Sequence, residues 1–269
     1  MKRLLFLNTQ KLTDINMETL ADTPKVTIIT VVYNAQATIE DTILSVIHQT
    51  YTNLEYIIVD GGSTDGTIKI INRYLDRIAR FISEPDKGIA DGFNKGIAMA
   101  TGDWIGMINA DDWYALNAVE LMMNNRSAND DVCCGNIMLI GKNGFERSKK
   151  SKVSWLNFGM YIMHPTCFIK KEVYQKVGMY DTGLKIAMDF DMFLRIKDNG
   201  FKIKHIDETV AYMRTDGVSS NTVKMHREEL AVMRRHLKGL SYFNSWIFNY
   251  LNRLRWKYFY KDPLRTQLN

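Results

Sequence analysis

Two adjacent carboxylates, Asp111 and Asp112, end a short apolar stretch that begins at Trp104. In open α/β sheets, ligands bind beyond the carboxyl ends of the parallel strands. Oxygen donors at such a point suit a divalent cation, and the cation suits a phosphorylated ligand. Asp is also a favoured residue at the start of a helix, so a helix cap explains the pair equally well. The pair alone leaves metal binding and capping open.

Two more acids, Asp189 and Asp191, interrupt the apolar segment Ile186–Arg195. Carboxylates are rarely buried without a partner, so an acid here is either paired or functional. Arg195 follows Asp191 by four residues and lies on the same helix face, which predicts an ion pair. Asp189 has no such local partner. It is therefore the better candidate for a general base, and a helix cap is its alternative.

Two loops add polar groups at the predicted ends of strands. The loop over 60–67 is rich in glycine and hydroxyl groups, which let a backbone approach a ligand closely, although an ordinary turn has the same composition. The stretch over 86–96 is dense in charge just before a helix. Lys87 or Lys95 could meet a phosphate there, and a solvated helix start is the alternative.

Alternating strands and helices must position these groups. Apolar and β-branched runs predict strands over 26–32, 54–59 and 80–83, each followed by an amphipathic helix. This alternation predicts an α/β fold with a mostly parallel sheet and right-handed crossovers. The elements predicted after Asp112 are a helix to Arg126, strands over 132–140 and 164–169, and a helix over 188–199. The change suggests a nucleotide-binding half, 25–113, and a second-substrate half, 114–220.

Composition excludes several classes of protein. The 269 residues are 46% hydrophobic and 24% charged, which is typical of globular chains, not of disordered ones. Three cysteines without metal-site spacing favour a reducing cytosol. The apolar run near Met1 is too short for a signal peptide, and no stretch approaches a membrane span. We expect a cytoplasmic protein that is soluble or peripheral at the cytoplasmic face of a membrane.

Five motifs together resemble one enzyme family, the family 2 glycosyltransferases. The motifs are Ile28–Asn34, Asp60–Thr67, Glu84–Gly88, Asn109–Trp113 and Ala187–Asp191. They occur in order and at the expected spacing, and the resemblance covers about residues 25–220. Each motif is weak alone, whereas five in register are specific.

The resemblance implies a GT-A fold, which is a Rossmann-like sheet flanked by helices, and inverting transfer of a sugar from a nucleotide-activated donor. Tyr33 matches the position that stacks on the base, and Asp60 the position that bonds a uracil edge. Asp86 and Lys87 fall where the ribose and diphosphate are held. The full donor-binding set implied is Tyr33, Asn34, Asp60, Gly62, Ser63, Asp86, Lys87, Asn94, Asn109, Ala110 and Asp111.

The same resemblance implies roles for the acids. Asp111 and Asp112 match the motif that binds Mn²⁺ or Mg²⁺, and Asp189 matches the catalytic base. The residues implied for the acceptor side or a closing loop are His164, Asp191 and Arg214. On general grounds a structural histidine is the more frequent case for His164. We expect a UDP-sugar as donor and a glycan or lipid-linked saccharide as acceptor, in the synthesis of surface polysaccharide or glycolipid.

Three positions depart from the family pattern. Asn109 stands where many members have the first Asp of D-x-D, Gly61 replaces a frequent second Asp, and Met188 replaces the Glu that often precedes the base. The sequence Asn252-x-x-Arg255-Trp256 imitates a motif of processive synthases but lies in the basic tail. We interpret it as coincidence and expect transfer of a single sugar.

The tail carries the basic character of the chain. From Lys224 onward ten Lys and Arg face three acids, although the formal net charge of the whole chain is only +5. We expect a lead-in over 1–24, a catalytic domain over 25–220 and a helical, basic and aromatic extension over 221–269. Trp246, Tyr250 and Leu254 at helical spacing predict an apolar stripe for an anionic membrane surface. A helix packed on the domain is the alternative of nearly equal weight, and no nucleic-acid partner is expected.

Two other functions are compatible with parts of this pattern. A sugar-phosphate nucleotidyltransferase shares the sheet and the metal requirement, but its glycine-rich signature is missing from Val26–Asn34. A non-catalytic module that binds a sugar nucleotide or a membrane is the second alternative.

Overall fold

The structure is a computed structural model that describes residues 23–141, 144–215 and 222–259, with side chains in the last range described over 224–252. The expected lead-in over 1–24 lies almost wholly outside the described residues. The expected closing loop is described only at Arg214 and Thr215.

Four parallel strands form one half of a mixed sheet, in the spatial order β3-β2-β1-β4. They are β1 (Val26–Val32), β2 (Leu54–Asp60), β3 (Arg80–Ser83) and β4 (Trp104–Asn109). The continuous apolar run of β1 is buried throughout, as is typical of a parallel strand covered on both faces. The register sets Val32 beside Asp60 and Val31 beside Asn109, so three strand ends meet at one edge. The predicted strands are confirmed.

The other half of the sheet is mixed. Its strands are β5 (Trp113–Tyr114), β6 (Val132–Ile140), β7 (Glu146–Lys149), β8 (Cys167–Lys170) and β9 (Ile203–Arg214). β8 runs antiparallel between β4 and β6, and β9 runs parallel to β6. The strand predicted from His164 begins only at Cys167, because His164–Thr166 forms a 3-10 turn around Pro165, which has no N–H to donate. β5 pairs with the end of β9, so Arg214 returns to the acidic end of β4.

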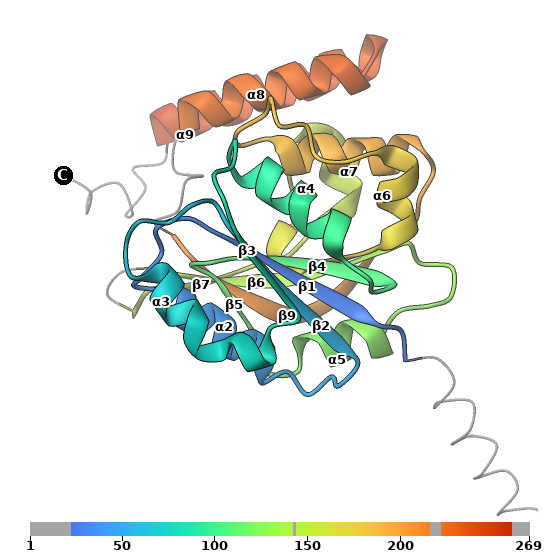
Figure 1. Ribbon diagram of the computed structural model, residues 1–269. Helices are drawn as coiled ribbons and strands as arrows, with labels where there is room; N and C mark the ends of the chain where they lie inside the picture. Colours follow the sequence, from blue (N-terminus) through green and yellow to red (C-terminus); the bar gives the residue numbers. More distant parts are fainter. Residues whose placement is uncertain (1–22, 142–143, 216–221, 260–269) are drawn as a thin grey trace, which may run out of the picture.

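Helices cover both faces of the sheet (Figure 1). On one face lie α2 (Ile39–Ile47), α3 (Thr67–Ile71) and α5 (Ala118–Asn124), and on the other lie α4 (Ile89–Met99), α6 (Lys171–Val177) and α7 (Met188–Asp198). The helices on each face pack against the sheet through their own apolar cluster. The sheet therefore separates two hydrophobic cores. The short 3-10 segments are η1 (Asn72–Arg77), η3 (Val153–Phe158) and η4 (His164–Thr166). The expected α/β architecture is confirmed.

Two helices, α8 (Thr222–His236) and α9 (Gly239–Phe259), close the described chain. α8 buries Val232 and Met233 completely in the cluster that contains α7. α9 rests on η3, where the Asn249 amide donates to the carbonyl of Phe158 over 2.8 Å. The expected helical extension is confirmed within the described range. Among the described residues, no helix combines the length and apolar character needed to cross a bilayer.

Candidate functional site

The loops after β1 and β2 are joined at the sheet edge. Tyr33 is 64% exposed directly after β1. Asn34 adopts a left-handed backbone with φ of 48°. This turn lets its N–H donate to Ser63 Oγ over 2.8 Å, while its side-chain oxygen accepts from the Thr64 N–H over 2.8 Å. Tyr33, Asn34 and Ser63 are therefore brought together as expected, with the Tyr33 ring exposed to solvent.

The Asp60 carboxylate bonds to groups of its own loop and of β3. The residue is fully buried, and its oxygens accept from the N–H groups of Gly62 and Ser63 and from the hydroxyls of Ser63 and Ser83. Every one of these donors comes from the loop after β2 or the end of β3. Asp60 thus shapes the loop, and its expected contact with a uracil edge stays a prediction.

Asp86 takes the place that Gly61 leaves empty. A Cβ built on Gly61 would lie 2.6 Å from one carboxylate oxygen of Asp86. The other oxygen, Oδ1, accepts the Gly88 N–H over 2.8 Å. In the motif that the sequence resembles, Gly61 replaces a frequent Asp. The loop after β3 brings the carboxylate of Asp86 to this place instead.

Three further residues predicted near the donor are Lys87, in the loop before α4, and Asn94 and Lys95, in α4. Lys87 is exposed, and its N–H is held by Asp91 over 3.0 Å. Lys95 is bound to Glu84 over 2.8 Å. Asn94 donates to the carbonyl of Tyr180 and accepts from its N–H, both over 2.9 Å. The Asn94 amide thus links α4 to the chain before α7, and its expected role in donor binding stays a prediction.

The acidic end of β4 contains one accessible carboxylate and one buried carboxylate. Asp111 is partly exposed, and burial raises its pKa while Arg214 opposes the rise. Asp112 is 1% exposed, and burial, then the charge of Asp111, raises its pKa well above the usual range. Asp112 accepts from the Arg214 N–H over 3.2 Å and from the Asn109 amide over 3.4 Å. Asp111 is therefore the more accessible of the two predicted metal ligands, and metal binding by Asp112 stays a prediction.

The Arg214 guanidinium brings positive charge to the acidic end of β4. Its guanidinium donates to the carbonyl of Asp111 over 2.6 Å and to Asp41 over 2.6 Å. It also lies 4.5 Å above the Trp113 ring, a cation–π distance. Arg214 is thus placed beside the acidic motif, where it can meet an anionic ligand.

A divalent cation fits this donor set. No three His, Cys, Asp or Glu side chains gather into a metal cluster within the described ranges. Mg²⁺-type sites, however, often use one or two carboxylates and complete their shell with water and substrate phosphates. Asn109 Oδ1 is buried without a hydrogen-bond partner, and it is the only such side-chain N or O atom in the part of the chain that the structure describes. An unpaired buried oxygen beside Asp111 is consistent with a site that a ligand completes.

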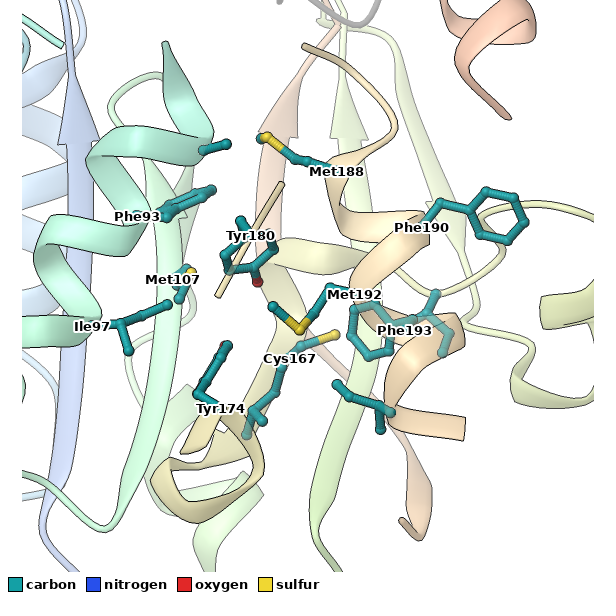
Figure 2. Packing of buried hydrophobic residues seen from close by; sticks show 14 of the residues in the cluster. Phe93, Ile97, Met107, Cys167, Tyr174, Tyr180, Met188, Phe190, Met192 and Phe193 are labelled. Carbon is teal, nitrogen blue, oxygen red and sulfur yellow. The ribbon is translucent and has the colours of Figure 1, made fainter. Parts of the chain in front are cut away.

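Asp189 is the second residue of α7 and lies in the chain between Met188 and Phe190, whose side chains belong to the apolar cluster of Figure 2. One oxygen accepts the Phe190 N–H over 2.7 Å, and no Lys, Arg or His of the described ranges forms an ion pair with this carboxylate. Met188, where relatives often have Glu, packs in the apolar cluster shared with Phe93 and Tyr180. Burial raises the pKa of Asp189 to about 6, and hydrogen bonds from the backbone only partly oppose this. A carboxylate of this kind is suited to accept a proton near neutral pH.

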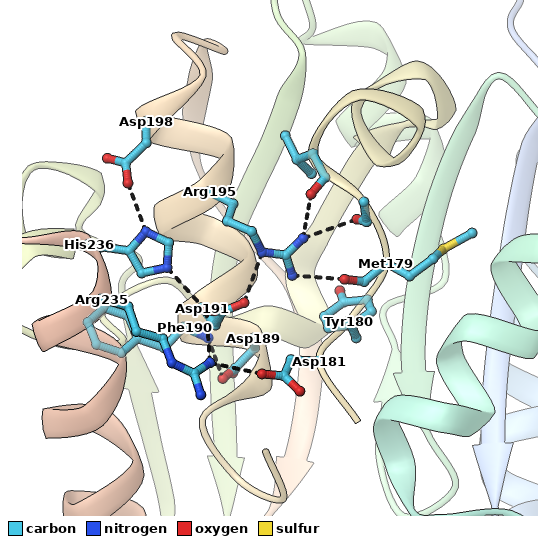
Figure 3. A network of polar contacts seen from close by, with 12 residues as sticks. Met179, Tyr180, Asp181, Asp189, Phe190, Asp191, Arg195, Asp198, Arg235 and His236 are labelled. Atoms are coloured by element: carbon cyan, nitrogen blue, oxygen red, sulfur yellow. Dashed lines mark hydrogen bonds and ion pairs between the residues drawn. The ribbon is translucent and has the colours of Figure 1, made fainter. Parts of the chain in front are cut away.

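Asp191 belongs to a separate ion-pair network (Figure 3). It bonds Arg195 over 2.9 Å, as the four-residue spacing predicted, and His236 over 3.1 Å. Arg195 also donates to the carbonyls of Val177, Gly178 and Met179. Asp191 therefore fixes α7 to its neighbours, and its expected place on the acceptor side or closing loop stays a prediction.

His164 is a structural residue. Its Nε2 lies 3.0 Å from the Tyr180 hydroxyl, and its ring packs 5.4 Å from that of Phe93. Burial lowers its pKa to about 4, so the ring is neutral at physiological pH. The alternative of a structural histidine is the one that this geometry supports.

Sequence reasoning missed two adjacent glutamates of α8, Glu228 and Glu229. Burial and the charge of Asp189 raise the pKa of Glu229 to about 7. One Glu228 oxygen, Oε2, accepts the N–H groups of Lys185, Ile186 and Ala187, which lead into Asp189. A signal was present, because these are two of the three acids in the otherwise basic tail.

The arrangement combines three chemical capacities. The exposed Tyr33 ring follows β1, and the partly exposed Asp86 carboxylate lies over Gly61, directly after β2. Asp111 lies after β4 with the Arg214 guanidinium beside it. The Asp189 carboxylate, with its raised pKa, lies at the start of α7. The loop before α7 touches the donor side directly, since Lys185 Nζ donates to the Lys87 carbonyl over 2.5 Å. Such a site can hold an anionic donor on one side and remove a proton on the other.

Known proteins match this chain over most of its length. A family model described as Glycosyl transferase family 2 matches residues 27–195. Hyaluronan synthase of Pasteurella multocida is 28% identical over 266 residues, which cover 91% of this chain and 26% of that protein. Chondroitin synthase of Escherichia coli is 27% identical over 268 residues, which cover 95% and 36%. The chain spans about a quarter to a third of the length of these relatives.

Solved structures share the fold. The crystal structure of S. aureus TarS superposes with a TM-score of 0.65 at 17% identity, covering 87% of this chain and 44% of that chain. The mannosyltransferase PcManGT from Pyrobaculum calidifontis, in complex with GDP-Man and Mn²⁺, gives 0.63 at 17% identity, covering 92% and 79%. The expected GT-A fold is confirmed by this likeness.

Proposed function

The chain belongs to glycosyl transferase family 2 and is a glycosyltransferase, and from that premise we propose that it transfers one sugar from a nucleoside diphosphate to a hydroxyl group with inversion. Membership removes the two alternatives, a nucleotidyltransferase and a non-catalytic module. The observation that carries the proposal is the carboxylate of Asp189, which has a raised pKa and lies at the start of α7, directly after a loop whose Lys185 donates to the Lys87 carbonyl.

The donor is a nucleotide sugar, and a UDP-sugar is the form we propose. TarS has been solved with UDP-GlcNAc, and PcManGT with GDP-Man. The exposed Tyr33 ring stacks on the base in this proposal, and Asp86, over Gly61, bonds the base edge or ribose. Lys87 and Arg214 meet the diphosphate with positive charge.

A divalent ion, Mn²⁺ or Mg²⁺, belongs to the same proposal. Asp111 would hold it, with Asn109 Oδ1 as the neighbouring neutral oxygen. When bound, the ion supplies Lewis-acid stabilisation of the negative charge on the departing diphosphate. Arg214 contributes positive charge to the same place from its own side chain.

Asp189 performs the proton transfer. The acceptor hydroxyl attacks the anomeric carbon from the face opposite the diphosphate while its proton passes to a carboxylate oxygen of Asp189. The new bond from carbon to the acceptor oxygen forms as the bond to the phosphate oxygen breaks, and the electron pair leaves with the diphosphate. A single displacement of this kind inverts the anomeric configuration without a covalent intermediate.

The pH dependence of kcat tests the assigned base. Asp189 works only when ionised, and its pKa is raised to about 6. We therefore expect kcat at saturating Mn²⁺ and donor to be constant above this pH and to fall about tenfold per pH unit below it. A rate that is unchanged between pH 8 and pH 5 would contradict the role of Asp189. A thermal-shift screen of nucleotide sugars with Mn²⁺ selects the donor for this assay.

The acceptor is proposed to be a glycan or lipid-linked saccharide at the cytoplasmic face of an anionic membrane. The support is a stripe of exposed apolar side chains on α9, in a tail whose sequence is rich in Lys and Arg. The stripe consists of Leu240, Phe243, Trp246, Tyr250 and Leu251. Trp246 and Tyr250 stack with their ring centroids 5.6 Å apart, on the side of the helix away from the buried Ser245.

Replacing Phe243, Trp246 and Tyr250 together by Ser tests the membrane contact. Because these side chains are exposed, we expect the variant to fold and to keep donor hydrolysis, while flotation with anionic vesicles is lost. Neutral vesicles and the parent chain are the controls. Flotation equal to that of the parent would show that this stripe does not bind membranes.

A further inference from the structure

α8 lies along α7 and is bonded to it at two places. Near the C-terminal end of α8, His236 bridges Asp191 and Asp198, over 3.1 and 2.8 Å (Figure 3). Between these polar contacts and Glu228, the completely buried Val232 and Met233 fill the space under α7. The two helices therefore form one packed pair, and the position of α7 depends on α8.

Glu228 makes the second attachment at the start of α7. Its Oε2 accepts from the backbone N–H groups of Lys185, Ile186 and Ala187 over 3.0, 2.7 and 3.0 Å. Ala187 is the residue that caps α7, and Asp189 follows two positions later. Burial alone would raise the pKa of Glu228, but these three N–H groups lower it, so the glutamate is ionised at neutral pH.

Three N–H groups on one oxygen fix the path of the chain just before Asp189. The same loop extends to the donor side, because Lys185 Nζ donates to the carbonyls of Lys87 and Thr182. The Asp189 carboxylate itself is held by backbone N–H groups at the start of α7, that of Phe190 among them. The orientation of its carboxylate thus depends on how the residues before it are held.

We propose that Glu228 is a positioning residue for the reaction: its carboxylate holds residues 185–187 so that Asp189 faces the acceptor hydroxyl. The inference rests on the proposed role of Asp189 as the base. Glu228 does not touch the reacting atoms. It acts through the backbone of the loop, and a displacement of the base by about 1 Å can lower a rate by about 10²-fold.

Two conservative substitutions of Glu228 separate hydrogen bonding from charge. Glu228→Gln keeps a side-chain oxygen at the same reach, so we expect kcat within about threefold of the parent. Glu228→Asp keeps the charge but shortens the side chain by one methylene and withdraws the oxygen from the three N–H groups. We expect it to lower kcat between about tenfold and 10²-fold, with the donor KM changed less than about threefold. Arg227→Ala, at an exposed neighbour on the same helix, is the matched control and should leave both constants unchanged.

The outcomes distinguish this inference from the proposed function. Parent-like kcat in Glu228→Asp, or equal losses in the Asp and Gln variants, would overturn the positioning role. Thermal unfolding of each variant is measured beside the kinetics, and a lower melting temperature with unchanged kcat would show a merely structural role. Asp189→Asn is assayed in the same series. If that variant keeps full activity, the proposed base fails, whatever Glu228 does.

Discussion

Replacing Asp189 by Asn is expected to lower the rate of sugar transfer by about 10² to 10⁴-fold, the usual contribution of a general base. The amide has nearly the same shape and still accepts the Phe190 N–H, so the local structure is retained. It cannot take the proton of the acceptor hydroxyl at any ordinary pH. The measurement is release of nucleoside diphosphate with acceptor present, together with donor affinity, which should change little.

Asp191→Asn is the matched control for this prediction, since it makes the same change two residues along α7. Asp191 is buried and paired with Arg195 and His236, so the substitution leaves the partly buried Arg195 guanidinium without its carboxylate partner. We expect Asp191→Asn to lower the melting temperature, while kcat per folded molecule stays near that of the parent. Similar losses of kcat in Asp189→Asn and Asp191→Asn would contradict the assignment of Asp189 as the base.

Replacing Asp111 by Asn is expected to cause the second large loss. Asp111 is the partly exposed carboxylate at the end of β4, and removing its charge weakens the site for a divalent ion. We expect the Mn²⁺ concentration for half-maximal activity to rise and kcat at physiological metal to fall by about 10²-fold, since a bound ion contributes several kcal/mol to leaving-group departure. Titration of Mn²⁺ in the presence of nucleoside diphosphate measures binding directly.

Asp112→Asn provides the comparison for Asp111. Its raised pKa means that the folded protein binds the Asp112 proton more tightly than the unfolded chain does. Ionising Asp112 therefore costs folding free energy as pH rises through the unfolded-state pKa, and the neutral Asn removes that cost. We expect Asp112→Asn to be at least as stable as the parent at neutral pH and to bind Mn²⁺ more tightly than Asp111→Asn does. A greater loss of Mn²⁺ affinity in Asp112→Asn would reverse the assignment.

Local patterns in the sequence were enough to predict the parallel half of the sheet. The run from Val26 to Val32 is apolar and β-branched, and both its extent and its burial follow from that pattern. The Asp191–Arg195 pair was also predictable, because a spacing of four residues on one helix determines it. The residues at the strand ends came from the family motifs in register, and the structure brings Tyr33, Asn34 and Ser63 together as expected.

Directions of side chains and contacts between distant segments did not follow from the sequence. Whether Asp60 points outward or into its own loop depends on Ser63 and Ser83, and the second of these lies on another strand. Asn94 is occupied by Tyr180, which is 86 residues away in sequence. Glu228 reaches the chain before Asp189 from more than 40 residues downstream. No spacing rule connects such residues, because only the packed fold brings them together.

The anomeric configuration of the released sugar tests the central claim most directly. The claim is a single displacement in which Asp189 takes the proton of the attacking hydroxyl, and water can serve as that hydroxyl when the acceptor is withheld. Proton NMR of the sugar released from an α-linked UDP-sugar, recorded before the anomers equilibrate, reports the first product. The account predicts the β-anomer first, and the α-anomer as the first product would contradict it.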